Sequence, residues 1–230
     1  MQGQIIKYLS KSFFLRKVVY LCHYLVNKIR IKGARNRVVY QKGALVWNMQ
    51  IVVKGEGNEI IIGPNTSLNN FKITIEGNNS TVNIGEGVFC YESAELNIEG
   101  NNACIDIDRC CTFGSVKMHV AEDHTAIIMG ADCMVSREVS INTSDFHTIM
   151  DLEQNKRINP PKKVVVKDHV WIGNGATINK GAEIGSNCVI ATNAVVSGKF
   201  EDNTVIAGVP AKVIRSGVTW SRKLLPYENK

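Results

Sequence analysis

Aromatic residues and prolines are scarce in this chain of 230 residues, which contains 7% aromatics and five prolines. This composition fits an array of short repeated elements better than a conventional β-sandwich. The seven cysteines are odd in number and include no Cys-x-x-Cys pair, so the sequence shows neither a disulfide framework nor a zinc-ribbon spacing. We expect them to pack as small apolar residues in a reducing compartment, which makes the cytoplasm the expected location.

The chain also lacks the short motifs of several function classes. It contains no phosphate-binding loop, no Gly-x-Gly-x-x-Gly, no helix-turn-helix pattern and no basic patch interleaved with aromatic residues. Nucleotide-dependent chemistry and nucleic-acid binding therefore have no support in the sequence.

Negative charge is absent from the beginning of the chain. No acidic residue precedes Glu56, whereas eleven lysines and arginines do, and the remainder carries 16 basic against 21 acidic residues. Apolar residues spaced by three or four predict a helix over residues 4–30 that ends at Gly33. We therefore expect residues 1–32 to form a basic amphipathic helix, distinct from the rest of the chain.

The sequence leaves three roles open for this helix. Its longest uncharged stretch, residues 18–27, is too short to cross a bilayer, and Arg16 and Lys17 interrupt any secretory signal. Residues 1–30 could make a peripheral contact with anionic lipid at the inner face of the membrane. The helix could equally pack on its own domain or on a neighbouring subunit. A basic groove for an anionic polysaccharide is a weaker third role.

A period of six residues organises the chain between residues 164 and 214. An α-helix needs apolar returns near 3.6 and a single strand near 2, whereas short parallel strands separated by tight corners sustain a longer period. Glycine and asparagine stand where the corners fall, and both accept positive φ at little cost. The pattern therefore predicts a parallel β-helix. The recurring positions are Ile172, Ile178, Ile184, Ile190 and Val196, with Val170, Ala176, Ala182, Cys188 and Ala194 two residues earlier.

A longer repeat precedes the hexads, between residues 38 and 141. Glu-Gly-Asn recurs at residues 56–58, 76–78 and 99–101. A second short pattern, an aliphatic residue or methionine followed by glycine or aspartate, recurs at a similar spacing. Each unit is too small to bury its own apolar face, so neighbouring units must stack. We expect one β-helix domain over residues 33–214, followed by a C-terminal tail over residues 215–230. The tail is expected to be a short helix or an irregular cap over the end of the domain, without chemistry.

The repeat fails once, between residues 142 and 163. This polar stretch keeps no hexad and includes the sequence Ser144-Asp145-Phe146-His147. A long excursion inside a compact repeat is usually functional. We expect a loop that protrudes between two coils and carries the chemistry.

Residues 170–176, the hexads after them and the closing residues 207–214 resemble the left-handed β-helix acyltransferases of the hexapeptide-repeat family. The loop at residues 144–147, followed by Trp171, is most similar to the O-acetyltransferases of bacterial surface polysaccharides, such as those acting on polysialic acid. The resemblance implies an all-β, left-handed parallel β-helix, here with an N-terminal α-helix, assembled as a homotrimer with active sites between subunits. It also implies transfer of an acetyl group from acetyl-CoA to a hydroxyl of a saccharide acceptor, in a direct ternary complex and without a metal.

His147 is the expected general base. Acetyl transfer needs a group that removes the hydroxyl proton as the oxygen attacks the thioester, and a neutral imidazole suits this task at cytosolic pH. Asp145, Asn142 or Asp151 could accept a hydrogen bond from the other ring nitrogen and hold the tautomer. A loop histidine without a role is the alternative, but its position in the single interruption of the repeat favours function.

Trp171, 24 residues after His147, is the second candidate. A large aromatic residue beside a hexad often serves packing alone, but similar enzymes have a Trp of this motif at the reaction centre. The resemblance therefore implies that Trp171 lines the tunnel where the thioester and the hydroxyl meet. A backbone N–H near residues 171–174 could bind the oxyanion.

The resemblance also implies a donor site, whose basic members suit the phosphates of coenzyme A. Ser197-Gly198-Lys199 stands where relatives commonly carry Thr-Lys-Asp, so Gly198 offers only its backbone. The implied donor contacts are Trp171, Gly173, Asn174, Thr192, Ser197, Gly198, Lys212 and Arg215.

Other activities remain open at this stage. N-acetylation of a nucleotide-linked amino sugar and O-acetylation of an antibiotic would use the same residues. From another class, His119 and His124 are similar to the His-xxxx-His pair of the γ-class carbonic anhydrases. The third metal ligand would then be His147 or His169, but its order along the chain relative to the pair differs from that in those enzymes. A non-enzymatic β-helix scaffold would not need the donor-binding motif at residues 207–214.

Overall fold

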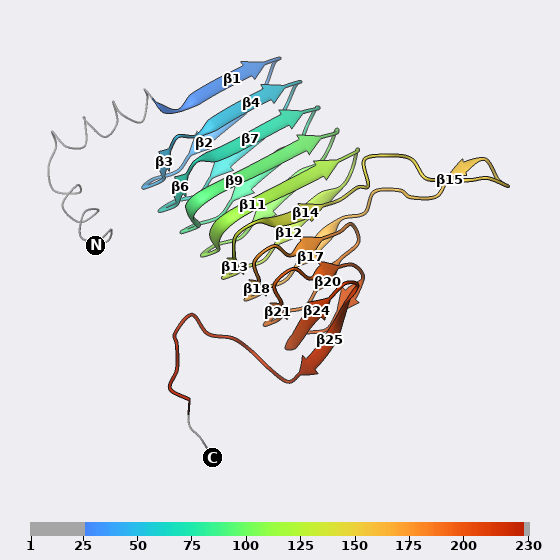
Figure 1. Cartoon of the computed structure of the whole chain (residues 1–230). Helices are drawn as coiled ribbons and strands as arrows, with labels where there is room; N and C mark the ends of the chain where they lie inside the picture. The colour runs from blue at the N-terminus through green and yellow to red at the C-terminus, as the bar shows by residue number, and fades with distance from the viewer. Residues whose placement is uncertain (1–25, 228–230) are drawn as a thin grey trace, which may run out of the picture.

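The body of the protein is a parallel β-solenoid, seen in a computed structural model that describes residues 26–227 (Figure 1). The chain winds through three faces, and the strands of each face stack in parallel on those of the preceding coil. The prediction of a parallel β-helix is confirmed. We number the faces in the order in which the chain passes through them, and each corner by the two faces that it joins.

Strands of decreasing length make up the faces. Face 1 comprises β1 (Lys28–Lys32), β4 (Gln50–Lys54), β7 (Phe71–Glu76), the second parts of β9 (Phe89–Glu99) and β11 (Thr112–Ala121), β14 (Val139–Asn142), β19 (Thr177–Ile178) and β22 (Val195–Val196). Face 2 comprises β2 (Arg37–Tyr40), β5 (Glu59–Ile62), β8 (Thr81–Ile84), β10 (Cys104–Ile107), β12 (Ala126–Met129), β17 (Val164–Val166), β20 (Glu183–Ile184) and β23 (Lys199–Phe200). Face 3 comprises β3 (Leu45–Trp47), β6 (Ser67–Asn69), the first parts of β9 and β11, β13 (Met134–Val135), β18 (Trp171–Ile172), β21 (Val189–Ile190) and β24 (Thr204–Gly208).

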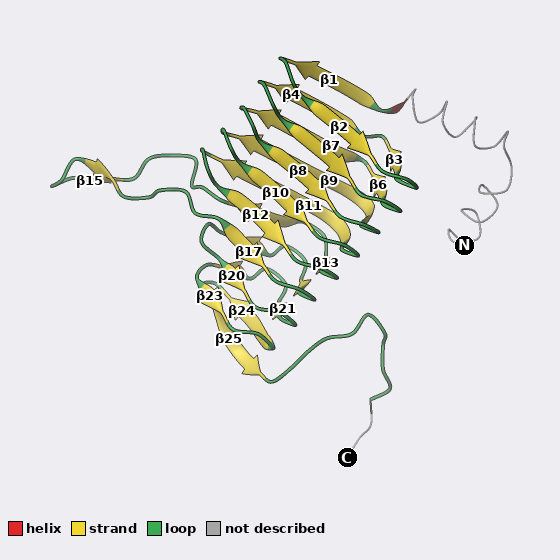
Figure 2. Ribbon diagram, turned by 180° about the vertical axis from the view of Figure 1, so that it is seen from behind, coloured by secondary structure: helices red, strands yellow, loops and turns green. Residues whose placement is uncertain are grey.

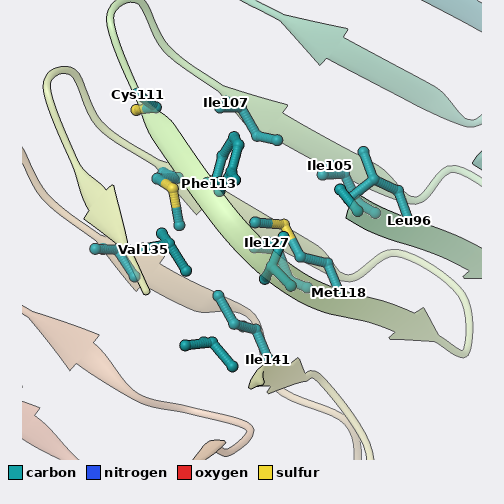
Figure 3. Packing of buried hydrophobic residues seen from close by; sticks show 14 of the residues in the cluster. Leu96, Ile105, Ile107, Cys111, Phe113, Met118, Ile127, Val135 and Ile141 are labelled. Atoms are coloured by element: carbon teal, nitrogen blue, oxygen red, sulfur yellow. The ribbon is translucent and has the colours of Figure 1, made fainter. Parts of the chain in front are cut away.

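Alternating residues on each strand point into one continuous core. In β7 the inward residues Phe71, Ile73 and Ile75 are fully buried, while the residues between them are partly or fully exposed. Figure 3 shows side chains of all three faces meeting inside the coils, with Phe113 and Ile107 among them. No unit has a separate core, so each coil depends on its neighbours for burial.

Tight stacking at the corners explains why glycine recurs there. Gly55 has a φ of +123°, and a Cβ added to it would lie 2.0 Å from the carbonyl oxygen of Gly77 in the next coil. Several asparagines take positive φ at other corners, among them Asn48, Asn70 and Asn193. These are the residue types that tolerate the left-handed region.

The solenoid narrows along its length (Figure 1). Val52 pairs with Thr74, 22 residues later, whereas Trp171 pairs with Val189, only 18 residues later. The strands of face 1 shorten from six residues in β7 to two in β19. The hexads therefore form smaller coils than the longer repeat upstream.

The predicted N-terminal helix is wrong at its end. Residues 28–32 form β1, and all five pair in parallel with Gln50–Lys54 of β4. The alternation of Lys28, Ile29, Arg30, Ile31 and Lys32 suits a strand stacked on the next coil, and this long-range pairing overrides the local helical spacing. The solenoid thus begins before residue 33, and the helix predicted over residues 1–25 lies outside the described residues. Within residues 26–227 no helix is long and apolar enough to cross a membrane.

The tail departs from its predicted form as well. β25 (Ala211–Ser216) turns back after a cis peptide at Pro210 and pairs antiparallel with β24. Beyond Ser216 the chain forms no helix up to residue 227 and returns along the side of the solenoid, where Trp220 contacts His169. It lies at the 2/3 corner instead of over the end of the coils.

Candidate active site

One segment leaves the solenoid. Residues 143–163 depart after β14 at the 1/2 corner and return at β17, and their middle forms an antiparallel hairpin of β15 (Met150–Asp151) and β16 (Lys156–Arg157). Figures 1 and 2 show this hairpin standing well away from the coils. We call residues 143–163 the hairpin loop.

His147 lies in the outgoing arm of the hairpin loop, with its side chain exposed. Its N–H donates to the carbonyl oxygen of Asp145 at 2.8 Å, and its own carbonyl accepts from Nδ2 of Asn159 at 2.7 Å. The imidazole makes no hydrogen bond or ion pair with any residue in 26–227. The backbone of His147 is therefore fixed while both ring nitrogens stay open to another molecule.

None of the predicted orienting residues holds this imidazole within the chain. The carboxylate of Asp145 accepts from Nζ of Lys180 at 2.5 Å and from Nδ2 of Asn159 at 2.8 Å. Asn142 donates to Oγ of Ser140 at 3.1 Å, and Asp151 accepts from two N–H groups of the hairpin turn. Each of the three is occupied elsewhere, so the prediction that one of them orients His147 is not met in a single chain.

Asn159 is the central anchor of the hairpin loop, and sequence reasoning missed it. Its side chain is 7% exposed. Its Oδ1 accepts from the N–H of Ile149 at 2.8 Å and from Nε of Arg157 at 3.2 Å, while Nδ2 donates to Asp145 and to the carbonyl of His147. One buried amide therefore joins both arms of the loop directly beside His147.

Two ion pairs tie the base of the loop to the solenoid. Arg157 donates to both carboxylate oxygens of Glu122, at 2.5 and 2.8 Å, and Ser144 donates to the same carboxylate at 2.6 Å. The hydrogen bond from Arg157 lowers the pKa of Glu122, and the hydrogen bond from Lys180 lowers the pKa of Asp145. Both carboxylates therefore stay ionised and keep the loop docked at neutral pH.

Trp171 lies on another side of the molecule. It begins β18 on face 3, its side chain is 38% exposed, and its Nε1 lies 3.4 Å from Oγ of Ser136. No hydrogen bond, ion pair or ring contact joins Trp171 to His147 in the part of the chain that the structure describes. A single chain thus does not bring the two candidates together.

The predicted donor residues divide into two groups. Gly173, Asn174 and Thr192 follow face 3 at the 3/1 corner, and β25 carries the exposed Lys212 and Arg215 beside face 3 of the last coil. Ser197 and Gly198 stand instead at the 1/2 corner, between β22 and β23, on the side where the hairpin loop emerges.

Gly173 has a structural role as well. A Cβ at this position would lie 2.7 Å from the carbonyl oxygen of Ile190 and 2.7 Å from the N–H nitrogen of Thr192. Close stacking of the coils therefore requires glycine here whether or not it contacts a donor.

The two histidines of the alternative metal site do not gather ligands. His119 lies on face 1 with its ring 4.6 Å from that of Phe146, whereas His124 is exposed at the 1/2 corner. Within residues 26–227 no group of three or more histidine, cysteine or acidic side chains is arranged to hold a metal ion.

A depression of about 460 Å³ opens on face 1 of the wider coils. Lys72, Glu95 and Lys117 line it, together with short polar side chains, and none of the predicted site residues does. We therefore place the candidate chemistry at His147 and Trp171 instead.

Comparison with known proteins identifies the family that this chain resembles. Residues 163–198 match the family model described as bacterial transferase hexapeptide (six repeats). The chain is 36% identical to a polysialic acid O-acetyltransferase of Escherichia coli O1:K1 / APEC over 50% of this chain and 38% of that protein. It is 34% identical to a polysialic acid O-acetyltransferase of Neisseria meningitidis over 54% of this chain and 58% of that protein. The chain thus spans less than two thirds of the length of either curated relative.

A solved structure extends the similarity to most of the fold. The crystal structure of the polysialic acid O-acetyltransferase OatWY superposes with a TM-score of 0.79 at 31% sequence identity, covering 86% of this chain and 92% of that one. The match includes the solenoid on both sides of the hairpin loop.

Proposed function

Because this chain belongs to the hexapeptide-repeat acyltransferase family, we propose that it transfers an acetyl group from acetyl-CoA to a hydroxyl of a saccharide, as part of a bacterial surface polysaccharide or its precursor. The observation that carries the proposal is the state of His147. Its imidazole has no partner within residues 26–227, although hydrogen bonds fix its backbone on both sides. A general base must be held in place and yet leave a ring nitrogen free for the acceptor hydroxyl.

The proposed reaction needs only one proton carrier. A neutral His147 removes the proton of the acceptor hydroxyl as its oxygen attacks the thioester carbonyl, forming a tetrahedral oxyanion. Collapse of this intermediate breaks the carbon–sulfur bond, and the imidazolium returns its proton to the departing thiolate. The products are the O-acetyl ester and free coenzyme A, without an acyl-enzyme and without a metal.

We propose that coenzyme A is bound by residues on face 3, at the 3/1 corner and on β25. Lys212 and Arg215 are exposed cations on β25, and phosphates are bound by such side chains. Trp171 would form a wall near the thioester, and Asn174 and Thr192 would contact the donor along the 3/1 corner.

A homotrimer with active sites between copies is part of the proposal. His147 and Trp171 lie on different sides of one chain, so a site that uses both needs a second copy. The hairpin loop supports this because it exposes Ile149, Leu152 and Ile158, of which Leu152 is 95% exposed. Face 3 exposes Tyr91 and Trp171, which are 44% and 38% exposed. Such a contact between different surfaces forms a ring when the rotation between copies closes after three.

Mixed assemblies test the shared site. His147→Ala and Trp171→Ala are each expected to be inactive, but co-expression should restore about one quarter of the wild-type activity, because some sites then receive both intact residues from different copies. No restoration in mixed assemblies would mean that each chain carries a complete site.

The reaction itself is tested by release of free thiol from acetyl-CoA. The purified chain would be offered a panel of glycans, amino sugars and hydroxyl antibiotics, with His147→Ala as the variant and Asn155→Gly, at the exposed hairpin turn, as the control. We expect release with a saccharide hydroxyl acceptor and a loss of about 100-fold or more in His147→Ala. Release with an amino sugar or an antibiotic alone would replace the proposed acceptor class, and unchanged turnover in His147→Ala would overturn the base assignment.

We also propose that the protein acts in the cytoplasm, where the donor is made available. The six cysteines within residues 26–227 are all free thiols, as a reducing compartment allows.

A further inference from the structure

The segment after β25 is attached to the side of the solenoid by a buried side chain, a hydrogen bond and a ring stack. Trp220 is 8% exposed and lies at the 2/3 corner, where its Nε1 donates to the carbonyl oxygen of His169 at 2.7 Å. Its indole stacks on the ring of His169 with centroids 4.3 Å apart and planes 8° from parallel. We call residues 217–224 the strap.

Both ring nitrogens of His169 have polar neighbours, one in the solenoid and one in the strap. Nδ1 lies 2.7 Å from a carboxylate oxygen of Asp132, and Nε2 lies 3.1 Å from the carbonyl oxygen of Trp220. Both neighbours are acceptors, so both contacts are hydrogen bonds only when each nitrogen carries a hydrogen. His169 thus lies between the Asp132 carboxylate and the Trp220 carbonyl, with its ring stacked on the face of the Trp220 indole.

Arg222 completes the attachment. Its guanidinium donates to Asp132 at 3.0 Å, to Oγ1 of Thr112 at 2.9 Å and to the carbonyl of Cys133 at 3.2 Å, and it lies 5.4 Å from the Trp220 ring. Burial alone would raise the pKa of Asp132, but the hydrogen bonds from His169 and Arg222 outweigh it and lower that pKa. The strap is thus fastened at two adjacent points.

The attachment lies directly beside Trp171. Only Val170 separates His169 from Trp171 along the chain, and the Trp220 ring lies 6.3 Å from the Trp171 ring at an interplanar angle of 50°. Within residues 26–227, the single polar contact of the Trp171 indole is the long one to Ser136, at 3.4 Å. The tilted packing on Trp220 is a further contact that can restrain the exposed indole.

We propose that the strap is a positioning element, in which Trp220 fixes the orientation of Trp171 and thereby one wall of the acetyl-transfer site. The inference rests on the proposed function, since Trp171 matters for turnover only if that reaction takes place here. Trp220 acts through Trp171 and touches neither substrate. A reacting group has to be held within a fraction of an ångström, and a remote contact that does this affects turnover more than binding.

A reporter based on tryptophan tests the restraint without any substrate. The chain has three tryptophans, so Trp47→Phe combined with a substitution of Trp220 leaves Trp171 as the only emitter. Trp220→Phe keeps a ring stacked beside His169, whereas Trp220→Ala removes it. We expect acrylamide to quench Trp171 more strongly in the alanine variant than in the phenylalanine variant, and equal quenching would overturn the proposal.

Truncation provides a second, matched pair. A chain ending at residue 216 loses the whole strap, and a chain ending at residue 224 keeps every contact described here. Both truncated chains carry Trp47→Phe, and the longer one also carries Trp220→Phe, so that Trp171 is the only emitter. The shorter chain should match full-length Trp220→Ala and the longer one full-length Trp220→Phe, with unchanged circular dichroism in both. The same quenching in the two truncated chains would also overturn the proposal.

Kinetics then separates positioning from a merely structural role. Trp220→Ala should lower kcat about tenfold and change KM for acetyl-CoA less than twofold, and Trp220→Phe should restore most of kcat. Looser Trp171 with unchanged kcat would overturn the proposal. Absence of thiol release from the wild type would refute the proposed function instead, and the quenching measurement would still report whether the strap holds Trp171.

Discussion

Replacing Asn159 with alanine should free the hairpin loop without unfolding the solenoid. The buried amide takes part in four hydrogen bonds, to Ile149, Arg157, Asp145 and His147. Each contributes about 1 kcal/mol net, and water recovers part of the loss, so local opening should become easier by about 2 to 4 kcal/mol. Since 1.4 kcal/mol is a factor of ten, the open loop should be about 30- to 700-fold more populated.

Amide hydrogen exchange measures this opening directly. The N–H of Ile149 donates to Oδ1 of Asn159 in the folded protein, so its exchange should accelerate by that factor or reach the unprotected rate. Amides inside β9 and β11 should exchange as in the wild type, because the coils keep all of their pairings. Turnover should fall about 10- to 100-fold, because a displacement of His147 by about 1 Å is costly.

Two further variants make the Asn159 experiment decisive. Asn159→Asp keeps an acceptor for Ile149 but loses the donor to His147 and brings a second carboxylate against Asp145, so it should open the loop at least as much. Asn155→Gly lies at the exposed hairpin turn at a φ of +48°, which glycine adopts freely, and should change nothing. Wild-type exchange at residues 144–150 in Asn159→Ala would refute the reasoning.

Four other outcomes follow from the fold and the sequence. Gly55→Ala should lower the melting temperature far more than Gly217→Ala, because both have positive φ but only Gly55 faces a backbone oxygen at 2.0 Å from the added Cβ. Phe113→Ala should cost about 3–5 kcal/mol in denaturant unfolding, since the ring is fully buried in the shared core. Lys180 and Asn159 lower the pKa of Asp145, so its contribution to docking is fully present above its ordinary value of about 3.9 and is lost as pH falls through the lowered value. Limited proteolysis should therefore spare the hairpin loop at pH 6 and cut it increasingly as the pH is lowered below about 3.9. Removing residues 1–25 should reduce sedimentation with anionic vesicles, and equal sedimentation would rule out the membrane role.

The fold was predictable because its signal is periodic and local. Every coil repeats the same inward positions, so the hexads from Val170 to Val196 carried the architecture without knowledge of any distant contact. The strand β1 was not predictable in this way. Ile29 and Ile31 alternate over only five residues, too few to outweigh the helical spacing before them, and pairing with β4 decides the conformation.

The candidate site was predictable where it interrupts the repeat and obscure elsewhere. His147 was found because residues 142–163 break the period. The residues that support the site act over distance: Asn159 meets Asp145 across 14 positions, Lys180 meets it across 35, and Trp220 meets His169 across 51. No spacing rule links such partners, because the coils bring them together only after folding.

The two ends of the solenoid are finished differently, and this bears on polymerisation. Stacked parallel coils resemble a fibre cross-section, and a free edge invites another copy to continue the stack. At one end, β25 runs antiparallel to β24 and breaks the register that a further coil would need. At the other end, β1 carries Lys28, Arg30 and Lys32, whose like charges would oppose an incoming strand of the same kind. Both features oppose the addition of a further coil to the described part of the solenoid.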